Sequence, residues 1–198
     1  MISPPDVQQV IEAMRSKGYR VFENPSGHDL NLVGIRTVDT TANSFNDWIT
    51  VFYMFDGVWN HFAFPGTTDP GLYYRENPAN VRGTAIMKPG QYRGAYMIGL
   101  HRGYKALQQK GPITVFRDRD GDEELDTSVS EEHTGIHAVN IHRANSYRAS
   151  TEVGKWSAGC QVFQDPDHFL FLLSLCEKAK EKFGNSFTYT LLEEGDLA

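Results

Sequence analysis

The sequence has little cysteine, no long apolar run and no excess of positive charge, and each absence excludes a class of protein. Two cysteines, Cys160 and Cys176, are too few for a disulfide-stapled scaffold or for a structural zinc site of their own, so we expect free thiols. No run of about eighteen apolar residues occurs, which argues against a membrane-spanning helix. The formal net charge of −6 argues against nucleic-acid binding, which favours a basic surface.

The sequence also lacks internal repeats, low-complexity segments and a recognisable linker. With 198 residues and 40% hydrophobic content, it is long and apolar enough to bury a core, so we expect residues 1–198 to form a single domain. Residues 1–6 show neither the basic nor the apolar segment of a secretory signal. We therefore expect a protein made in the cytoplasm that either acts there or is released by another route.

One amphipathic helix is expected near each end of the chain. Apolar residues recur at helical spacing over residues 7–17, and Gly18 follows as a stop signal. Residues 165–183 begin with an Asp-Pro pair suited to a helix start and carry an apolar face. Cys176 lies on that face, which predicts a buried core thiol. Residues 193–198 are expected to form a frayed tail.

Between these helices the sequence consists of short runs of β-branched and aromatic residues separated by turns. An Asp56-Gly57 pair predicts a hairpin. The absence of a long helical pattern disfavours a doubly wound parallel sheet, so we expect an α+β protein that is predominantly β. The expected strands are residues 19–22, 30–36, 48–55, 58–64, 83–87, 95–100, 113–117 and, after the second helix, 186–192.

Three other features have simple interpretations. Residues 118–126 alternate carboxylates around a glycine, as half of an EF-hand loop does, but no glutamate stands at the twelfth position, so we favour a solvated hairpin tip over a calcium site. Residues 67–71 are rich in turn formers and predict a tight turn rather than a substrate-facing loop. His101 is interpreted as a satisfied polar residue, with the rim of a cleft as the alternative.

Three histidines, His133, His137 and His142, precede Cys160. Gly135 and the β-branched residues around it make a helix improbable here, and in a strand His142 would face away from the other two. A three-histidine zinc centre is therefore disfavoured, and we expect no metal or cofactor. A histidine near a cysteine instead suggests a nucleophile and its base, because imidazole can accept the thiol proton.

Residue types alone leave open whether Cys160 is a nucleophile or a structural cysteine. A strand ending at His142, a polar loop over 144–155 and a return through 157–163 would bring the two side chains together. This stretch resembles the catalytic motif of the L,D-transpeptidase (YkuD-like) family, a histidine, about fourteen to seventeen residues, then Ser/Thr-His-Gly-Cys. Fourteen residues separate His142 from Ser157. The matching residues are Ser157, Gly159 and Cys160, and the resemblance covers residues 135–163.

The resemblance implies a YkuD-like β-rich catalytic domain in which Cys160 is the nucleophile, His142 is the general base, and backbone N–H groups around Gly159 and Cys160 form the oxyanion hole. It further implies a cysteine acyl-transferase or peptidase whose partners are peptidoglycan stem peptides. The thioacyl-enzyme would pass to an amine, giving a crosslink, or to water, giving hydrolysis. The residues expected to bind substrate are Ser157, Arg143, Trp156 and Asn140.

Two positions depart from the family pattern. Ala158 replaces the motif histidine, and Val162 stands where the family usually has Arg or Asn. Together with the missing signal, the resemblance favours a phage lysis enzyme (an endolysin) or a delivered antibacterial effector, and cleavage over crosslinking. The alternatives are a non-catalytic wall-binding or virion structural domain and a thiol hydrolase acting on a cytoplasmic peptide or amide.

Overall fold

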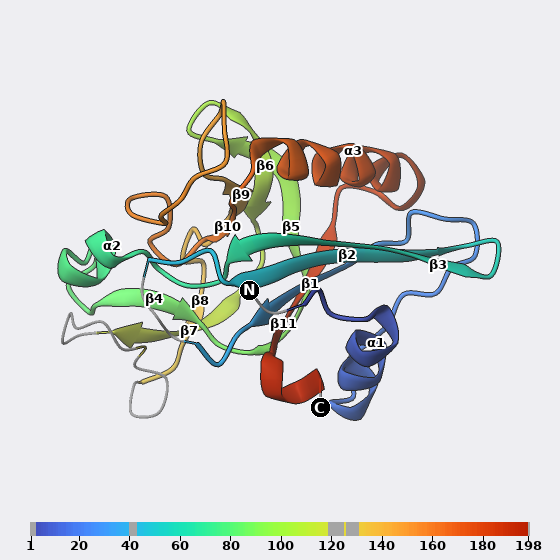
Figure 1. The fold of residues 1–198 in the computed structure, drawn as a ribbon, viewed down its shortest axis with the longest axis horizontal. Helices are drawn as coiled ribbons and strands as arrows, with labels where there is room; N and C mark the ends of the chain where they lie inside the picture. The colour runs from blue at the N-terminus through green and yellow to red at the C-terminus, as the bar shows by residue number, and fades with distance from the viewer. Residues whose placement is uncertain (1–2, 40–42, 119–124, 126–130, 198) are drawn as a thin grey trace.

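Figure 1 shows the computed structural model, which describes residues 3–39, 43–118, 125 and 131–197. Its centre is a closed β-barrel, and closure gives each barrel strand a hydrogen-bonded neighbour on both sides. In order around the barrel, the strands are β1 (Asn31–Arg36), β11 (Phe187–Glu193), β5 (Gly90–His101), β6 (Tyr104–Gln109), β9 (Ile141–Arg143), β10 (Gln161–Phe163), β3 (Val58–Thr67) and β2 (Asp47–Phe55).

The longest barrel hairpin, β2–β3, turns at Asp56 and Gly57, as the sequence predicted. Both residues have positive φ, 50° and 76°, which a two-residue turn of the right twist requires. The register runs without interruption from Phe55 opposite Val58 to Asp47 opposite Gly66. The hairpin therefore brings the chain back to the end of the barrel where the loop after β3 begins.

Two helices cover different parts of the barrel (Figure 1). Helix α1 (Val7–Ser16), which has a capping box at Asp6, packs its buried face against the outer surface of β1 and β2. Helix α3 (Pro166–Phe183) joins the larger core cluster, which includes buried Cys176. Both predicted helices are thus confirmed. Because β1 contributes to both clusters, all six of its residues are buried.

A second, antiparallel sheet lies beside the barrel and consists of β4 (Thr84–Met87), β7 (Ile113–Asp118) and β8 (His133–Gly135). The short helix α2 (Leu72–Glu76) is tied to it by an ion pair between Arg75 and Asp118, with 3.5 Å between Nε and Oδ2. Both side chains are almost completely buried.

The structure corrects several sequence predictions. Residues 19–22 are not a strand, because the Phe22 backbone bonds to the side chain of Asn31 instead of to a strand. Strand β6 and helix α2 were not predicted. The predicted frayed tail is wrong for the described residues 194–197, which form the 3₁₀ helix η1 (Glu194–Leu197) and are held by an ion pair between Lys17 and Asp196.

Of the acidic segment 118–126, only residues 118 and 125 belong to the described residues. The prediction of a solvated hairpin tip at 119–124 and 126 lies outside them. Asp118 is buried in the second sheet and so does not belong to a solvated tip. In the described part of the chain, no helix has the length and apolar character needed to cross a membrane.

Candidate active site

A pair of short parallel strands, β9 and β10, brings the predicted base and nucleophile together. His142 lies at the centre of β9 in register with Val162 of β10, and Cys160 immediately precedes β10. The pairing continues one residue further, where the Gln161 N–H donates to the Asn140 carbonyl at 2.9 Å. The predicted strand–loop–return arrangement is therefore present.

The turn before Cys160 is fixed by hydrogen bonds of Ser157. Its hydroxyl donates to the Cys160 carbonyl at 2.8 Å and accepts from the Gly159 N–H at 3.1 Å. Its own carbonyl accepts from the Gly71 N–H at 2.9 Å, which joins the turn to the loop after β3. Ser157 thus holds the backbone in the conformation that presents the cysteine.

Gly159 is required in this turn for two physical reasons. Its φ of 112° lies in a region that L-residues with side chains rarely adopt. A Cβ there would also lie only 2.4 Å from the carbonyl oxygen of Ala85. The turn can therefore pack against β4 only with glycine at this position.

Cys160 has a partly exposed side chain whose sulfur makes two polar contacts. Sγ accepts from the Asn140 N–H at 3.4 Å and donates to the Ala138 carbonyl at 3.6 Å. Burial of the sulfur raises the pKa of the thiol to about 11, against a smaller lowering from the Asn140 N–H. The resting group at neutral pH is therefore the thiol, with a backbone donor already directed at the sulfur.

His142 is held in one tautomer. Its Nδ1 lies 2.8 Å from the Arg143 carbonyl, and because a carbonyl only accepts, Nδ1 carries the proton. Nε2 is then the basic nitrogen, and it is buried with no hydrogen-bond partner among the described residues. Burial lowers the pKa of His142 to about 3, so the ring is neutral at physiological pH and its free lone pair is available as a base.

Both groups open into a cleft of about 620 Å³ between the end of the barrel and the second sheet. This volume lies within the range of small-molecule and peptide sites. The barrel side contributes His101, Asn140, His142 and Cys160, and the sheet side includes Thr84, Ala85 and Arg117. Trp156 and Ala158 also line the cleft.

The predicted site residues divide between the cleft and its surroundings. Trp156 and Asn140 line the cleft. Ser157 does not, because its side chain is fully buried behind the turn. Arg143 also lies outside the lining and stacks its guanidinium 4.4 Å from the centre of the Tyr104 ring. The Gly159 N–H, expected in the oxyanion hole, is already used by Ser157.

His101, interpreted from the sequence as a satisfied polar residue with the cleft rim as the alternative, lies against the base. Its ring stacks on His142 with centroids 4.2 Å apart and planes 13° from parallel. Its Nδ1 lies 3.1 Å from Asn140 Nδ2. In the sequence, the one indication of this position was that His101 precedes a turn at Gly103, which suggested the cleft rim but not a contact with His142.

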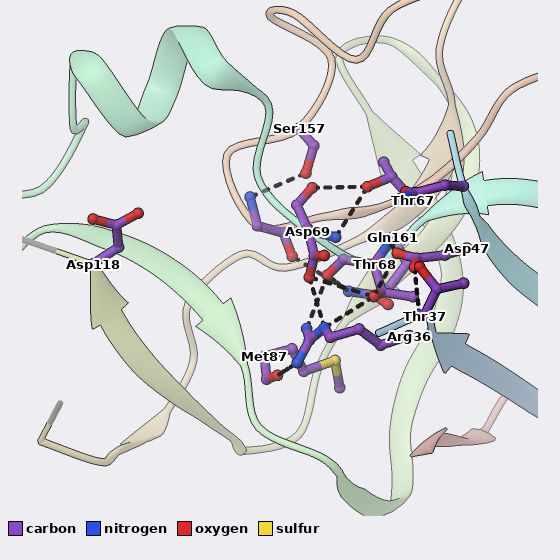
Figure 2. Close-up of polar contacts among 12 residues, drawn as sticks. Arg36, Thr37, Asp47, Thr67, Thr68, Asp69, Met87, Asp118, Ser157 and Gln161 are labelled. Carbon is purple, nitrogen blue, oxygen red and sulfur yellow. Dashed lines mark hydrogen bonds and ion pairs between the residues drawn. The ribbon is translucent and has the colours of Figure 1, made fainter. Parts of the chain in front are cut away.

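A second group of polar residues, here called the lower cluster, is largely buried and is drawn around Arg36 and Asp47 in Figure 2. Arg36 Nε donates to Asp69 Oδ1 at 2.7 Å, and its Nη1 donates to the Met87 carbonyl at 3.1 Å. Asp47 accepts three hydrogen bonds, from the backbone N–H of Thr37 and from the N–H and hydroxyl of Thr68, at 2.7–2.9 Å. Burial, with the nearby Asp69 charge, raises the pKa of Asp47 to about 7.

Gln161 connects this cluster to the nucleophile turn. Its Nε2 donates to the carbonyls of Thr68 and Gly159 at 3.3 and 3.4 Å, and its Oε1 accepts from the Tyr189 hydroxyl at 2.8 Å. The loop at 67–71, predicted as a tight turn, is therefore also the segment that links the barrel interior to the turn carrying Cys160.

Comparisons of this chain with protein-family models, with curated proteins and with solved structures find no match. The local geometry and the motif spacing are thus the basis for a functional assignment.

Proposed function

We propose that this protein is a cysteine-dependent acyl-transferase or peptidase of the L,D-transpeptidase (YkuD-like) type that acts on peptidoglycan stem peptides. Cys160 is the nucleophile and His142 is the general base. The observation that carries the proposal is Nε2 of His142, a buried acceptor with a fixed tautomer that has no partner in the described part of the chain and shares a cleft with a thiol. A buried acceptor without a partner is costly, and a proton-accepting role explains it.

The first half-reaction forms a thioester. Cys160 Sγ attacks the acyl carbon while the thiol proton passes to His142 Nε2, and the resulting imidazolium returns that proton to the leaving amine as the C–N bond breaks. The Arg143 carbonyl, which accepts from Nδ1–H, orients the ring in both states. A backbone carbonyl therefore does the work that a carboxylate does in many catalytic triads.

The second half-reaction releases the acyl group. Water or an acceptor amine attacks the thioester carbon, His142 Nε2 takes its proton, and that proton passes to the departing sulfur. Water gives hydrolysis and an amine gives a crosslink. The chemistry on the protein is the same for both, so the acceptor that reaches the cleft decides the product.

The resting pair is a neutral thiol and a neutral imidazole rather than a preformed ion pair. The pKa of Cys160 is raised to about 11 and that of His142 is lowered to about 3, each by burial. Thiolate then forms only as attack proceeds, in contrast to enzymes that hold a stable thiolate–imidazolium pair. The Asn140 N–H, which points at Sγ, stabilises the developing negative charge.

The cleft composition supports a peptide that carries carboxylates, as stem peptides do. Arg102, Arg117 and Lys155 line it, and none of the described lining residues has a carboxylate. This positive bias stands out in a chain whose net charge is −6. The exposed Trp156 adds an aromatic surface at the same site.

The test is to incubate the purified protein with isolated murein sacculi and to read released and joined muropeptides by mass spectrometry. Wild type and Cys176→Ala, which changes only the core thiol, are expected to alter the muropeptide profile. Cys160→Ala and His142→Ala are expected to leave it unchanged. A profile that wild type leaves unchanged, or that Cys160→Ala changes equally, would contradict the proposal and favour a non-catalytic wall-binding domain.

A further inference from the structure

The hydrogen bonds of Asn140 fix the state of a second cleft histidine, His101. Asn140 Oδ1 accepts from the Gln109 N–H at 2.9 Å, so the other end of the amide, Nδ2, faces His101 Nδ1 at 3.1 Å. An amide NH₂ group only donates. His101 Nδ1 must therefore accept, and the proton of the neutral ring lies on Nε2.

The surroundings of His101 keep it neutral. Its ring is stacked on His142, and the positive charges of Arg102 and Arg143 act on this pair and disfavour a further positive charge there. Tyr104 packs edge-on against the other side, with ring centroids 5.6 Å apart. Burial and the Arg102 charge lower the pKa of His101. A proton on Nδ1 would also place two N–H donors against each other at Asn140.

The nucleophile turn provides only one of the two donors that were expected in the cleft. A thioester-forming reaction places negative charge on the acyl oxygen, and such charge is stabilised by donors directed at it. The Gly159 N–H is used by Ser157, so of the two backbone groups expected there only the Cys160 N–H makes no hydrogen bond within the described chain. The hydrogen bond described for the His101 ring is made by Nδ1, so among the described residues Nε2 has no partner, and His101 lines the cleft.

We propose that His101 is a catalytic residue that donates its Nε2–H to the acyl oxygen of the substrate, and that Asn140 is the positioning residue that fixes this tautomer. The inference rests on the proposed function, since it assigns a further role in the same cleft. It also gives the stacked histidines separate tasks: His142 accepts a proton through Nε2, and His101 donates a hydrogen bond through Nε2. Asn140 contacts both reactive groups: its backbone N–H donates to Sγ of Cys160, and its side-chain amide donates to Nδ1 of His101.

Three substitutions separate the donor role from ring stacking. His101→Gln places an amide nitrogen near the position of Nε2, His101→Phe keeps the stacked ring without a donor, and His101→Asn keeps neither. We expect kcat on a soluble disaccharide tetrapeptide to fall about 10²-fold in His101→Phe and His101→Asn, with KM little changed. His101→Gln is expected to recover most of that loss. Equal kcat for Phe and wild type, or a Phe variant more active than Gln, would overturn the donor role.

Asn140→Asp tests the positioning role through pH. A carboxylate accepts from His101 Nδ1–H, which moves the neutral-ring proton away from Nε2 and raises the pKa of the ring. The variant should therefore lose kcat as pH rises and His101 gives up its Nε2 proton, whereas wild type should not. Asn145→Asp, which adds the same charge outside this cleft, is the matched control and should behave as wild type. Identical pH profiles for Asn140→Asp and wild type would count against the role of Asn140.

A measurement without substrate distinguishes failure of this inference from failure of the proposed function. Nitrogen-15 shifts of the imidazole rings, assigned with His101→Gln, report which nitrogen carries the proton. We expect Nε2–H for His101 and Nδ1–H for His142. A His101 proton on Nδ1 overturns the inference even in an active enzyme. A wild type without action on murein overturns the proposed function, and the donor role with it.

Discussion

The lower cluster and the cleft, which Gln161 connects, differ in how completely their hydrogen bonds are made. In the lower cluster, Asp47 accepts three hydrogen bonds and Arg36 reaches a carboxylate, a hydroxyl and two carbonyls. In the cleft, Nε2 of His142 is buried and unpartnered within the described chain. The hydrogen-bonded lower cluster is therefore suited to stabilising the fold, and the cleft, with its unpartnered acceptor, is suited to chemistry.

The difference shows where stability and chemistry are separated. Gln161 hydrogen-bonds both to Thr68 of the lower cluster and to Gly159 of the nucleophile turn, so the lower cluster helps to hold the turn in place. The cleft residues therefore do not have to hydrogen-bond to one another to keep their positions. Substitutions in the two regions should then have opposite signatures: those in the cleft should affect rate, and those in the lower cluster should affect the free energy of unfolding.

The largest effect is expected for His142→Gln. Glutamine cannot accept the thiol proton, so turnover on murein peptides should fall about 10³-fold or more, within the range for general-base loss. The melting temperature should stay within a few degrees of wild type, because the lost group was an unsatisfied acceptor. Measuring turnover and thermal unfolding on the same preparations checks both the expected loss of rate and the expected retention of stability. If His142→Gln instead lost much stability and kept its turnover rate, His142 would be a structural residue and not the general base.

Gly159→Ala should affect rate and stability together. The added Cβ meets the Ala85 carbonyl and imposes a strained φ, so the turn must shift and move Cys160. We expect loss of most activity and a melting temperature lower by several degrees. Gly195→Ala is the matched control, since a Cβ there meets no atom within 4 Å. If Gly159→Ala were as stable and active as this control, the turn would not set the position of Cys160.

Asp47→Asn should destabilise the protein. One Asp47 carboxylate oxygen, which accepts from the N–H of Thr37 or of Thr68, is replaced by an NH₂ group that can only donate. One buried hydrogen bond is then lost, which should lower the free energy of unfolding by about 2 kcal/mol. Urea unfolding of the variant against wild type measures this, and exposed Asp167→Asn serves as the control. A variant as stable as wild type would mean that the lower cluster is not the support described above.

The same carboxyl predicts a pH dependence of stability. The pKa of Asp47 is raised from 3.8 to about 7 in the folded protein, so the folded state binds more protons than the unfolded state between these values. Its contribution to stability is complete below about pH 4 and is lost as pH rises through 7. The free energy of unfolding of wild type should therefore decline over this window more than that of Asp47→Asn. Parallel curves would contradict this assignment.

The smallest effect concerns the reactivity of the free thiols. With the pKa of Cys160 raised to about 11, alkylation by iodoacetamide in the absence of substrate should be slow at pH 7 and rise through pH 10. Buried Cys176 should not react in the folded protein. Peptide mapping after timed alkylation distinguishes the two sites. Rapid modification of Cys160 at neutral pH would indicate a preformed thiolate instead.

The features that the sequence predicted correctly are those encoded locally or by a short register. The helices at 7–16 and 166–183 carry their own start signals and apolar faces, and the Asp56-Gly57 hairpin carries its own turn chemistry. The approach of His142, on β9, and Cys160, just before β10, also followed from the predicted strand, loop and return over a short stretch of chain.

Features that depend on the closing of the barrel were not predictable in the same way. Strand β6 has a weak β pattern, Tyr-Lys-Ala-Leu-Gln-Gln, and becomes a strand because β5 and β9 lie on either side of it. The stacking of His101 on His142 follows from that same order of strands. Arg36 and Asp69 are separated by 33 residues and meet only in the folded core. Asp118 was assigned to an acidic tip because its ion pair with Arg75 leaves no sequence signal.

The parallel pairing of β9 and β10, with the turn at 157–159, sets the spacing of base and nucleophile, so this spacing does not depend on the length of the outer loop around Tyr147. The connecting loop is anchored at several points, including Ser150 to the Gln164 carbonyl and Gly154 to the Asn43 side chain, while Tyr147 at its outer part is 93% exposed. The outer loop is thus a natural place for new chain termini in a circular permutant or for an inserted tag. Variation in loop length among any homologues would leave the reactive pair intact.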